Sequence, residues 1–253
     1  MEPGMDTEYR ALAARTDYLA LDRADIQYAV KGICRGMARP TLGDKRKLKR
    51  LARYLKENPR VVSMSPFQGR PGEFDGFSDS DWAGCHGTAK STSGGAIQIG
   101  SRCIKTWSST QKSITLCSGE TELVAAVKMC KEFIGVTQLA YDWGVEMGAR
   151  VHVDSSAAIG VAQRKGNGNL RHVRVGMLWI QEKIADGEVD MIKIQGEENP
   201  ANLTTKHLTE QKIRKHISTL NQEFEDGRAE KSLQIGSLED TDVQSEQIAI
   251  RQF

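Results

Sequence analysis

Two aspartates, Asp79 and Asp81, stand close together in the stretch GFSDSDWAG, residues 76–84, where the pattern predicts a buried strand. Burying an unpaired carboxylate is costly, so such a pair near a strand end indicates a cation site, a hydrogen-bonding turn or contact with water. An Asx-type turn that caps the strand is the simplest interpretation of this stretch alone. A chemical role would need further carboxylates from elsewhere in the chain.

Two more acidic side chains fall at positions where ligands commonly occur. Glu122 lies in the first turns of a helix predicted from Ser118 to about Trp143, and Asp154 ends the predicted strand ARVHVD. Taken singly, each has an ordinary explanation. Acids are favoured in first helical turns, and an aspartate can cap the helix that starts at Ser155. Only the joint arrangement predicts chemistry.

Together these carboxylates predict a metal site. Ligand sites of open sheets lie at the carboxyl ends of strands, and a helix packed across the two strands would bring Glu122 between Asp79 and Asp154. Carboxylates this close repel one another unless divalent cations are present, and hard oxygen ligands suit Mg²⁺ or Mn²⁺. The arrangement is typical of a two-metal phosphoryl-transfer site. Spacing does not decide between Asp79 and Asp81. It equally leaves Glu120 and Glu122 open.

The elements that would position these residues fall into four segments. Residues 1–60 read as a helical segment, 61–72 as a Pro- and Gly-containing linker, 73–208 as a layered domain, and 209–253 as a polar, acidic tail expected to be disordered or loosely helical. Within the layered domain the patterns follow the order βββαβααβα. That order predicts an α/β (α+β layered) fold, a mixed five-stranded sheet flanked by helices.

One helix of the first segment is strongly basic. Residues 41–59, TLGDKRKLKRLARYLKENP, carry an apolar stripe formed by Leu48, Leu51, Tyr54 and Leu55. Two interpretations stay open with equal weight: a solvated charged face around a packed seam, or a helix that faces phosphates. The net charge of +2 does not decide between them.

Composition and cysteine usage restrict the class of protein. The five cysteines are odd in number and form no Cys-x-x-Cys pair, which predicts reduced thiols in an intracellular protein, cytoplasmic or nuclear. The sequence shows no secretory signal pattern and no apolar run long enough to span a bilayer, so we expect a soluble protein without membrane contact.

The motifs resemble those of a known family. SDSDWAG…KSTSGG…W, SGETELVAAV, VHVDSSAAIGVA and PANLTTKHL follow the order and spacing of the ribonuclease H domain of copia-type retrotransposon Pol polyproteins, from about Gly76 to Leu208. The segment YRALAARTDYLALDRADIQYAV…RYLKENP resembles the end of the reverse transcriptase region that precedes this domain. The resemblance covers roughly four-fifths of the chain and implies a ribonuclease H-like fold.

The resemblance also implies roles for four positions. It selects Asp79, Glu122 and Asp154 as catalytic carboxylates that bind two Mg²⁺ ions, with Mn²⁺ as a substitute, and it places Asn202 where the family has an aspartate. An amide offers only a neutral oxygen and a weaker magnesium ligand. The polymerase part of such polyproteins carries adjacent aspartates, and this sequence contains no Asp-Asp. We therefore expect no DNA synthesis from this chain, and interpret it as a fragment, a separated reading frame or a decayed copy.

The implied activity is a metal-dependent endonuclease that hydrolyses the RNA strand of RNA–DNA hybrids without a small-molecule cofactor. Its expected partners are the hybrid and the polymerase part of the same or a related polyprotein. Candidates for contact with the hybrid are Ser80, Arg102, Lys105, Lys112, Arg171 and Arg174. For each basic residue taken singly, an ordinary solvated surface position is the more common case.

Two alternatives stay open. One is a catalytically decayed ribonuclease H-like domain that acts as a nucleic-acid-binding or scaffold module, favoured by Asn202 and by the missing polymerase aspartates. The other is an interaction module whose acidic tail recruits a protein partner.

Overall fold

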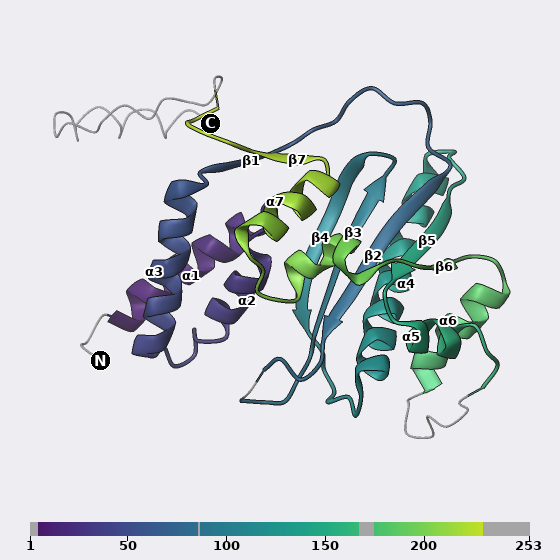
Figure 1. Cartoon of the computed structure of the whole chain (residues 1–253), viewed down its shortest axis with the longest axis horizontal. Coiled ribbons are helices and arrows are strands. Elements are labelled where there is room, and N and C mark those ends of the chain that lie inside the picture. The colour runs from purple at the N-terminus through teal and green to yellow at the C-terminus, as the bar shows by residue number, and fades with distance from the viewer. Residues whose placement is uncertain (1–4, 86, 167–174, 230–253) are drawn as a thin grey trace, which may run out of the picture.

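The computed structural model describes residues 5–85, 87–166 and 175–229. Figure 1 shows a central sheet with helices on both faces and a group of three helices beside it. The strands of the sheet are β2 (Glu73–Asp81), β3 (Thr92–Ile99), β4 (Arg102–Thr110), β5 (Gly148–Val153) and β6 (Asp190–Lys193). Their order is β4-β3-β2-β5-β6. β2, β3 and β4 pair antiparallel, whereas β2–β5 and β5–β6 pair parallel, so the predicted mixed five-stranded sheet is confirmed.

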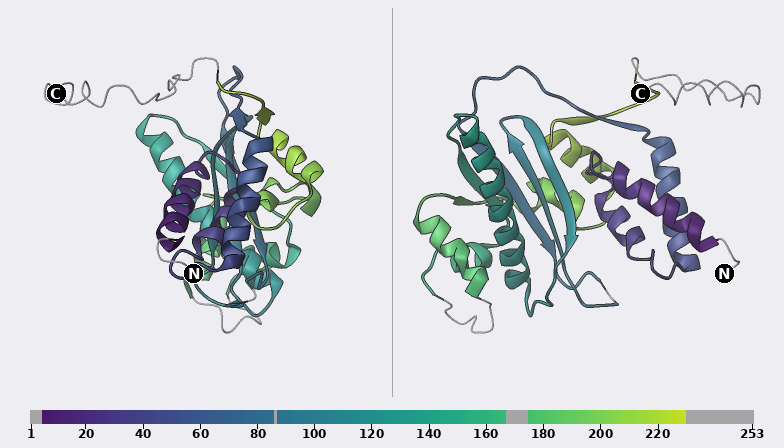
Figure 2. Two further views of the ribbon diagram at one scale, coloured as in Figure 1. Left: turned by 90° about the vertical axis from the view of Figure 1, so that its left-hand side faces the viewer. Right: turned by 180° about the vertical axis from the view of Figure 1, so that it is seen from behind.

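Helix α4, Ser118–Asp142, covers one face of the sheet, and Figure 2 shows it lying along the strands from behind. A Cβ at Gly76 would lie 2.5 Å from the ring of Phe133, so glycine in β2 lets the helix pack closely. Leu123, Val127, Cys130 and Phe133 of this helix are buried, whereas Ile134 is 38% exposed. The same layer contains α5 (Ser156–Ala162) and α6 (Val175–Ala185).

The opposite face carries shorter elements. These are η1 (Gly196–Glu198), η2 (Pro200–Thr204) and α7 (Glu210–Thr219). Asn199 ties η2 to the sheet, because its Nδ2 donates a hydrogen bond of 2.8 Å to the carbonyl of Ser78. A Cβ at Gly94 would collide with Thr204, so this glycine of β3 allows η2 to sit directly on the strands.

The N-terminal helices form a core of their own. They are α1 (Met5–Leu19), α2 (Gln27–Cys34) and α3 (Leu42–Glu57). Thr41 and Asp44 form a capping box at the start of α3, and the predicted stripe of that helix packs into the same core. α2 also meets the sheet, since Gln27 Nε2 donates 2.8 Å to Thr106 Oγ1 of β4. The helical segment is therefore docked on the sheet edge.

Two predicted boundaries need correction. The strand β1, Arg60–Ser63, enters the segment expected to be a linker, and it pairs antiparallel with β7, Gln222–Glu225, from the segment expected to be disordered. The disorder prediction is thus wrong for 210–225, where α7 and β7 fold. Ile217 and Leu220 are 1% exposed and pack against the sheet side of the molecule, so a few spaced apolar side chains outweigh the polar composition. Residues 230–253 of the predicted tail lie outside the described residues.

All five cysteines are free thiols. No helix in the described part of the chain is long and apolar enough to cross a membrane.

Candidate metal centre

Three carboxylates converge at the end of the sheet formed by the carboxyl ends of β2 and β5. Asp79, Glu122 and Asp154 each offer an oxygen, and these oxygens lie within 4.8 Å of one another. Asp79 is near the carboxyl end of β2, and Asp154 directly follows β5, which pairs parallel with β2. Glu122 joins them from the first turns of α4. The convergence is the one expected from the sequence; the catalytic role of these residues stays a prediction.

The electrostatics of this acidic cluster are unfavourable for three free charges. Asp79 is fully buried, and burial raises the pKa of its carboxyl. Burial, together with the charges of Asp79 and Asp154, raises the pKa of Glu122 to about 8. Glu122 Oε1 accepts a hydrogen bond of 3.3 Å from the backbone N–H of Ser80, whereas its Oε2 is buried without a partner among the described residues. Burial and mutual repulsion therefore disfavour the charged forms of these carboxylates.

The counter-charge that is present comes from two lysines. Lys206 Nζ donates a hydrogen bond of 3.2 Å to Asp79 Oδ1, and Thr205 Oγ1 donates to Asp79 Oδ2. Lys193 Nζ donates to the backbone carbonyl of Asp154. None of these three residues was among the predicted site residues. For Thr205 and Lys206 the available signal was their position in TTK, directly after Asn202 and Leu203.

Asn202 lies beside the cluster and is 6% exposed. Its Nδ2 donates a hydrogen bond of 2.6 Å to the carbonyl of Gly196, and a Cβ at Gly196 would lie 3.0 Å from Asp154 Oδ2. The Oδ1 of Asn202 is buried and has no partner among the residues that the structure describes. The orphaned Oε2 of Glu122, with the carboxylates of Asp79 and Asp154, forms a hard oxygen donor set. These residues fit Mg²⁺ or Mn²⁺.

The two choices that spacing left open are distinguished by hydrogen bonds. Asp81 accepts from the backbone N–H of Thr92 and, at 3.0 Å, from its hydroxyl, so it holds the β2–β3 connection. Glu120 Oε2 accepts 2.8 Å from the backbone N–H of Leu116 and supports the approach to α4. The geometry places Asp79 and Glu122, rather than their neighbours, in the acidic cluster.

Of the predicted hybrid contacts, Ser80 and Lys112 lie at the end of the sheet that carries the cluster. Ser80 is 7% exposed and supplies the N–H bound by Glu122. Lys112 is exposed and comes just after Thr110, the last residue of β4.

Two other predicted contacts, Arg102 and Lys105, are not brought to the cluster. Arg102 begins β4, and its pairing with Ile99 places it at the far end of the sheet. Lys105 Nζ forms an ion pair of 2.6 Å with Glu132 of α4. Arg171 and Arg174 lie outside the described residues.

Comparison with known proteins gives relatives among transposon proteins. The chain is 27% identical over 207 residues to the retrovirus-related Pol polyprotein from transposon RE1 of Arabidopsis thaliana, covering 80% of this chain and 14% of that protein. The corresponding polyprotein from transposon TNT 1-94 of Nicotiana tabacum is 28% identical over 186 residues, covering 73% and 14%. An uncharacterized mitochondrial protein of Arabidopsis thaliana, AtMg00810, is 35% identical over 116 residues, covering 46% and 48%. The chain thus spans 14% of the length of the transposon polyproteins it matches. No family model matches.

Among solved structures, a complex of LC11-RNase H1 with an RNA/DNA hybrid aligns with 53% of this chain and 94% of its own, at 17% identity and a TM-score of 0.36. The strand order and the helices on both faces confirm the α/β (α+β layered) fold expected from the sequence, a mixed five-stranded sheet flanked by helices. The chain is related to the Pol polyproteins of copia-type retrotransposons, which confirms the resemblance read from its motifs.

Proposed function

We propose that this chain hydrolyses the RNA strand of RNA–DNA hybrids in a reaction that needs divalent cations. The observation that carries the proposal is the convergence of Asp79, Glu122 and Asp154 within 4.8 Å, in a site where three carboxylates pair with a single lysine, Lys206, among the described residues. An unmatched cluster of buried acids costs stability. Such a cost is typical of a functional site.

Different pairs of carboxylates would bind the two cations. Asp79 and Asp154 would hold one Mg²⁺ ion and Asp79 with Glu122 the other, while Asn202 Oδ1 offers a neutral ligand. Ions held in this way lower the pKa of a water molecule and neutralise charge on the phosphate and the leaving oxygen. Hydrolysis joins the water oxygen to phosphorus and breaks the bond to the 3′-oxygen, giving a 5′-phosphate and a 3′-hydroxyl.

Lys206 fits this proposal as a replaceable counter-ion. It pairs with Asp79 through a side chain that is 44% exposed, so the ammonium can leave the carboxylate at little cost when a divalent ion takes its place. The backbone around Ser80 is fixed by its hydrogen bond to Glu122, which holds the carboxylate in position. The proposed partners are the hybrid and the polymerase part of the same or a related polyprotein.

The test is cleavage of an end-labelled RNA–DNA hybrid in Mg²⁺ and then in Mn²⁺. Asp79→Asn is compared with Asp81→Asn, and Glu122→Gln with Glu120→Gln. In each pair the second variant is the control, because it makes the same chemical change at an acid two residues away that is not part of the cluster. We expect the wild type, Asp81→Asn and Glu120→Gln to cleave. Asp79→Asn and Glu122→Gln should not.

The outcomes separate the alternatives. Salt-sensitive binding of the hybrid without cleavage would support a decayed binding module instead. Cleavage that survives both Asp79→Asn and Glu122→Gln would exclude the acidic cluster as its source.

A further inference from the structure

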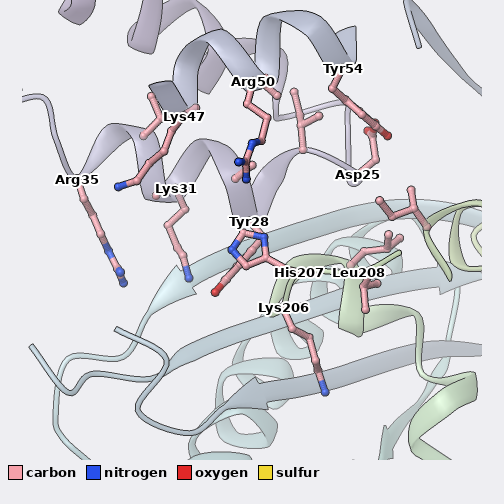
Figure 3. A pocket seen from close by; sticks show the side chains of 17 residues that line it. Asp25, Tyr28, Lys31, Arg35, Lys47, Arg50, Tyr54, Lys206, His207 and Leu208 are labelled. Atoms are coloured by element: carbon pink, nitrogen blue, oxygen red, sulfur yellow. The ribbon is translucent and has the colours of Figure 1, made fainter. Parts of the chain in front are cut away.

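A cavity of about 500 Å³ lies between the N-terminal helices and the η2–α7 side of the domain. Figure 3 shows α2 and α3 above it and the segment around His207 below. Its lining combines five cations, namely Lys31, Arg35, Lys47, Arg50 and Lys206. Lys47 and Arg50 belong to α3, the helix for which the sequence left a phosphate-facing role open.

Two of the five cations of this basic cavity are paired, Lys47 with Asp44 at 2.9 Å and Lys206 with Asp79 at 3.2 Å, whereas no ion pair is seen for Lys31, Arg35 or Arg50 among the described residues. The one acidic residue that lines the cavity, Asp25, is already paired with Arg23 at 2.7 Å and accepts a hydrogen bond of 2.8 Å from Tyr54. Arg50 points into the cavity (Figure 3) and has no hydrogen bond or ion pair to the described residues. Burial and the nearby Arg35 lower the pKa of Lys31 to about 8. An anion would relieve this crowding.

Aromatic rings lie among the cations. The ring of Tyr28 is half-buried and packs edge-on against His207, with centroids 4.9 Å apart. Lys31 Nζ lies 4.7 Å from the centroid of the Tyr28 ring. Sites for unpaired nucleic acid combine such rings, which stack on bases, with cations that bind the backbone. The volume suits a nucleotide unit and not a duplex.

The cavity is next to the acidic cluster. Lys206 lines the cavity and also binds Asp79, and its neighbour His207 contacts Tyr28. On the other side, Lys31 donates to Thr92 Oγ1, and Thr92 binds Asp81 at the end of β2. A strand that leaves the cluster therefore meets the basic cavity within the reach of one or two side chains.

We infer that the basic cavity binds an unpaired nucleic-acid strand that runs on from the hybrid at the acidic cluster. The choice of ligand rests on the proposed function. Phosphates lie against Arg50, Lys47 and Arg35, and a base lies against the ring of Tyr28. The N-terminal helices thereby extend the binding surface beyond the ribonuclease H-like sheet.

The test compares two fluorescent RNA–DNA hybrids of one sequence, one blunt and one with a DNA extension of about 10 nucleotides, the scale of one single-strand site. Binding is measured by anisotropy in EDTA over a range of salt. Arg50→Gln is compared with Arg53→Gln, which makes the same change on α3 at an exposed residue that does not line the cavity. Melting temperatures establish that both variants fold.

For the wild type we expect the extension to strengthen binding, roughly tenfold, with a steeper salt dependence. Arg50→Gln should weaken binding of the extended hybrid about 3–10-fold and reduce the salt slope by about 1. It should leave cleavage of the blunt hybrid in Mg²⁺ unchanged. Arg53→Gln should behave as wild type.

Three results overturn the inference: no gain from the extension, equal losses in Arg50→Gln and Arg53→Gln, or displacement of the extension by a mononucleotide as effective as by a single strand. Cleavage of the hybrid tests the proposed function independently of binding to the extension. If the wild type binds the extension through Arg50 but cleaves no hybrid, the basic cavity stands and the nuclease proposal fails. If the wild type cleaves the hybrid but the extension does not strengthen binding, the nuclease proposal stands and the basic-cavity inference fails.

Discussion

One face of the β2–β5 pair carries two groups of acids with opposite surroundings. Asp75 and Asp79 lie four residues apart on β2, and their side chains therefore point to the same side of the strand. Across from Asp75, Arg150 donates two hydrogen bonds of 3.0 Å, and His152 Nε2 lies 2.8 Å away. Although burial alone would raise it, these partners lower the pKa of Asp75.

At the other end of the same two strands, acids meet acids. Asp79 faces Asp154 and Glu122, and the direction of its pKa shift is upward, chiefly because it is buried. Burial of a carboxylate in this sheet therefore does not by itself decide the direction of its pKa shift, because basic partners can outweigh burial. At one end Asp75 has both Arg150 and His152 as partners, whereas at the other end three carboxylates pair with one lysine, Lys206, among the described residues. The following predictions test that contrast, beginning with the largest effect.

The largest expected effect is loss of cleavage in Asp79→Asn. Removing one charged ligand that stabilises the reacting phosphate should lower the rate on the order of 10²–10³-fold or more. The same variant should lose the rise in melting temperature that Mg²⁺ gives the wild type, because ligand binding stabilises only a protein that binds it. Differential scanning fluorimetry with and without Mg²⁺ measures this. An equal Mg²⁺-dependent rise in Asp79→Asn would place the cation elsewhere.

The pH dependence of stability without metal should follow Glu122. Its folded pKa of about 8 lies above the reference value of 4.5, so the folded state holds a proton that the unfolded state has released between these pH values. Stability therefore falls as pH rises from about 4.5 to 8, by roughly 2–4 kcal/mol. Urea unfolding in EDTA across this range measures the slope. Glu122→Gln should flatten it and raise stability at pH 8, whereas Glu120→Gln should not.

At the Asp75 end of the strands, removal of the carboxylate charge should lower stability, whereas removal of the Glu122 charge should raise it at pH 8. Asp75→Asn leaves Arg150 and His152 without their shared carboxylate, although Arg150 keeps an ion pair of 2.7 Å with Glu73. Because these groups are partly exposed, the expected loss is about 1–2 kcal/mol, or a few degrees in melting temperature. The Mg²⁺-dependent shift should persist. A more stable Asp75→Asn protein would contradict the contrast between the two ends.

The same contrast shows what could be predicted from the sequence. The mixed five-stranded sheet followed from the pattern of elements along the chain. The pattern also predicted that acids of β2, β5 and α4 meet, because ligand sites lie at the carboxyl ends of strands and a helix packed across them adds its own side chains. The choice of Asp79 over Asp81 came from the family resemblance and not from spacing, and the structure places Asp79 in the cluster while Asp81 binds Thr92. Spacing along a strand does not contain that information.

The elements missed by the sequence analysis all depend on long-range contacts. β7 is four residues long and exists by pairing with β1, more than 150 positions earlier in the chain. The contact of Lys206 with Asp79 likewise joins residues far apart in sequence. Local composition around 209–225 is polar and does not reveal the pairing of β7 with β1, so that segment was expected to be disordered or loosely helical.

The smallest expected effect concerns Asn202, the position where the resembled family has an aspartate. Asn202→Asp would add a charged oxygen beside Asp154 and should tighten Mg²⁺ binding, raising cleavage at low Mg²⁺ by up to about tenfold, or roughly 1.4 kcal/mol. It would also lose the Nδ2 donor to Gly196, so the metal-free protein should become less stable by about 1 kcal/mol. Cleavage as a function of Mg²⁺ concentration and melting in EDTA measure the two effects. A lower Mg²⁺ requirement together with a lower metal-free melting temperature would mean that η2, through position 202, is part of the cation site. An unchanged Mg²⁺ requirement would mean that Asn202 serves only to hold Gly196 in place.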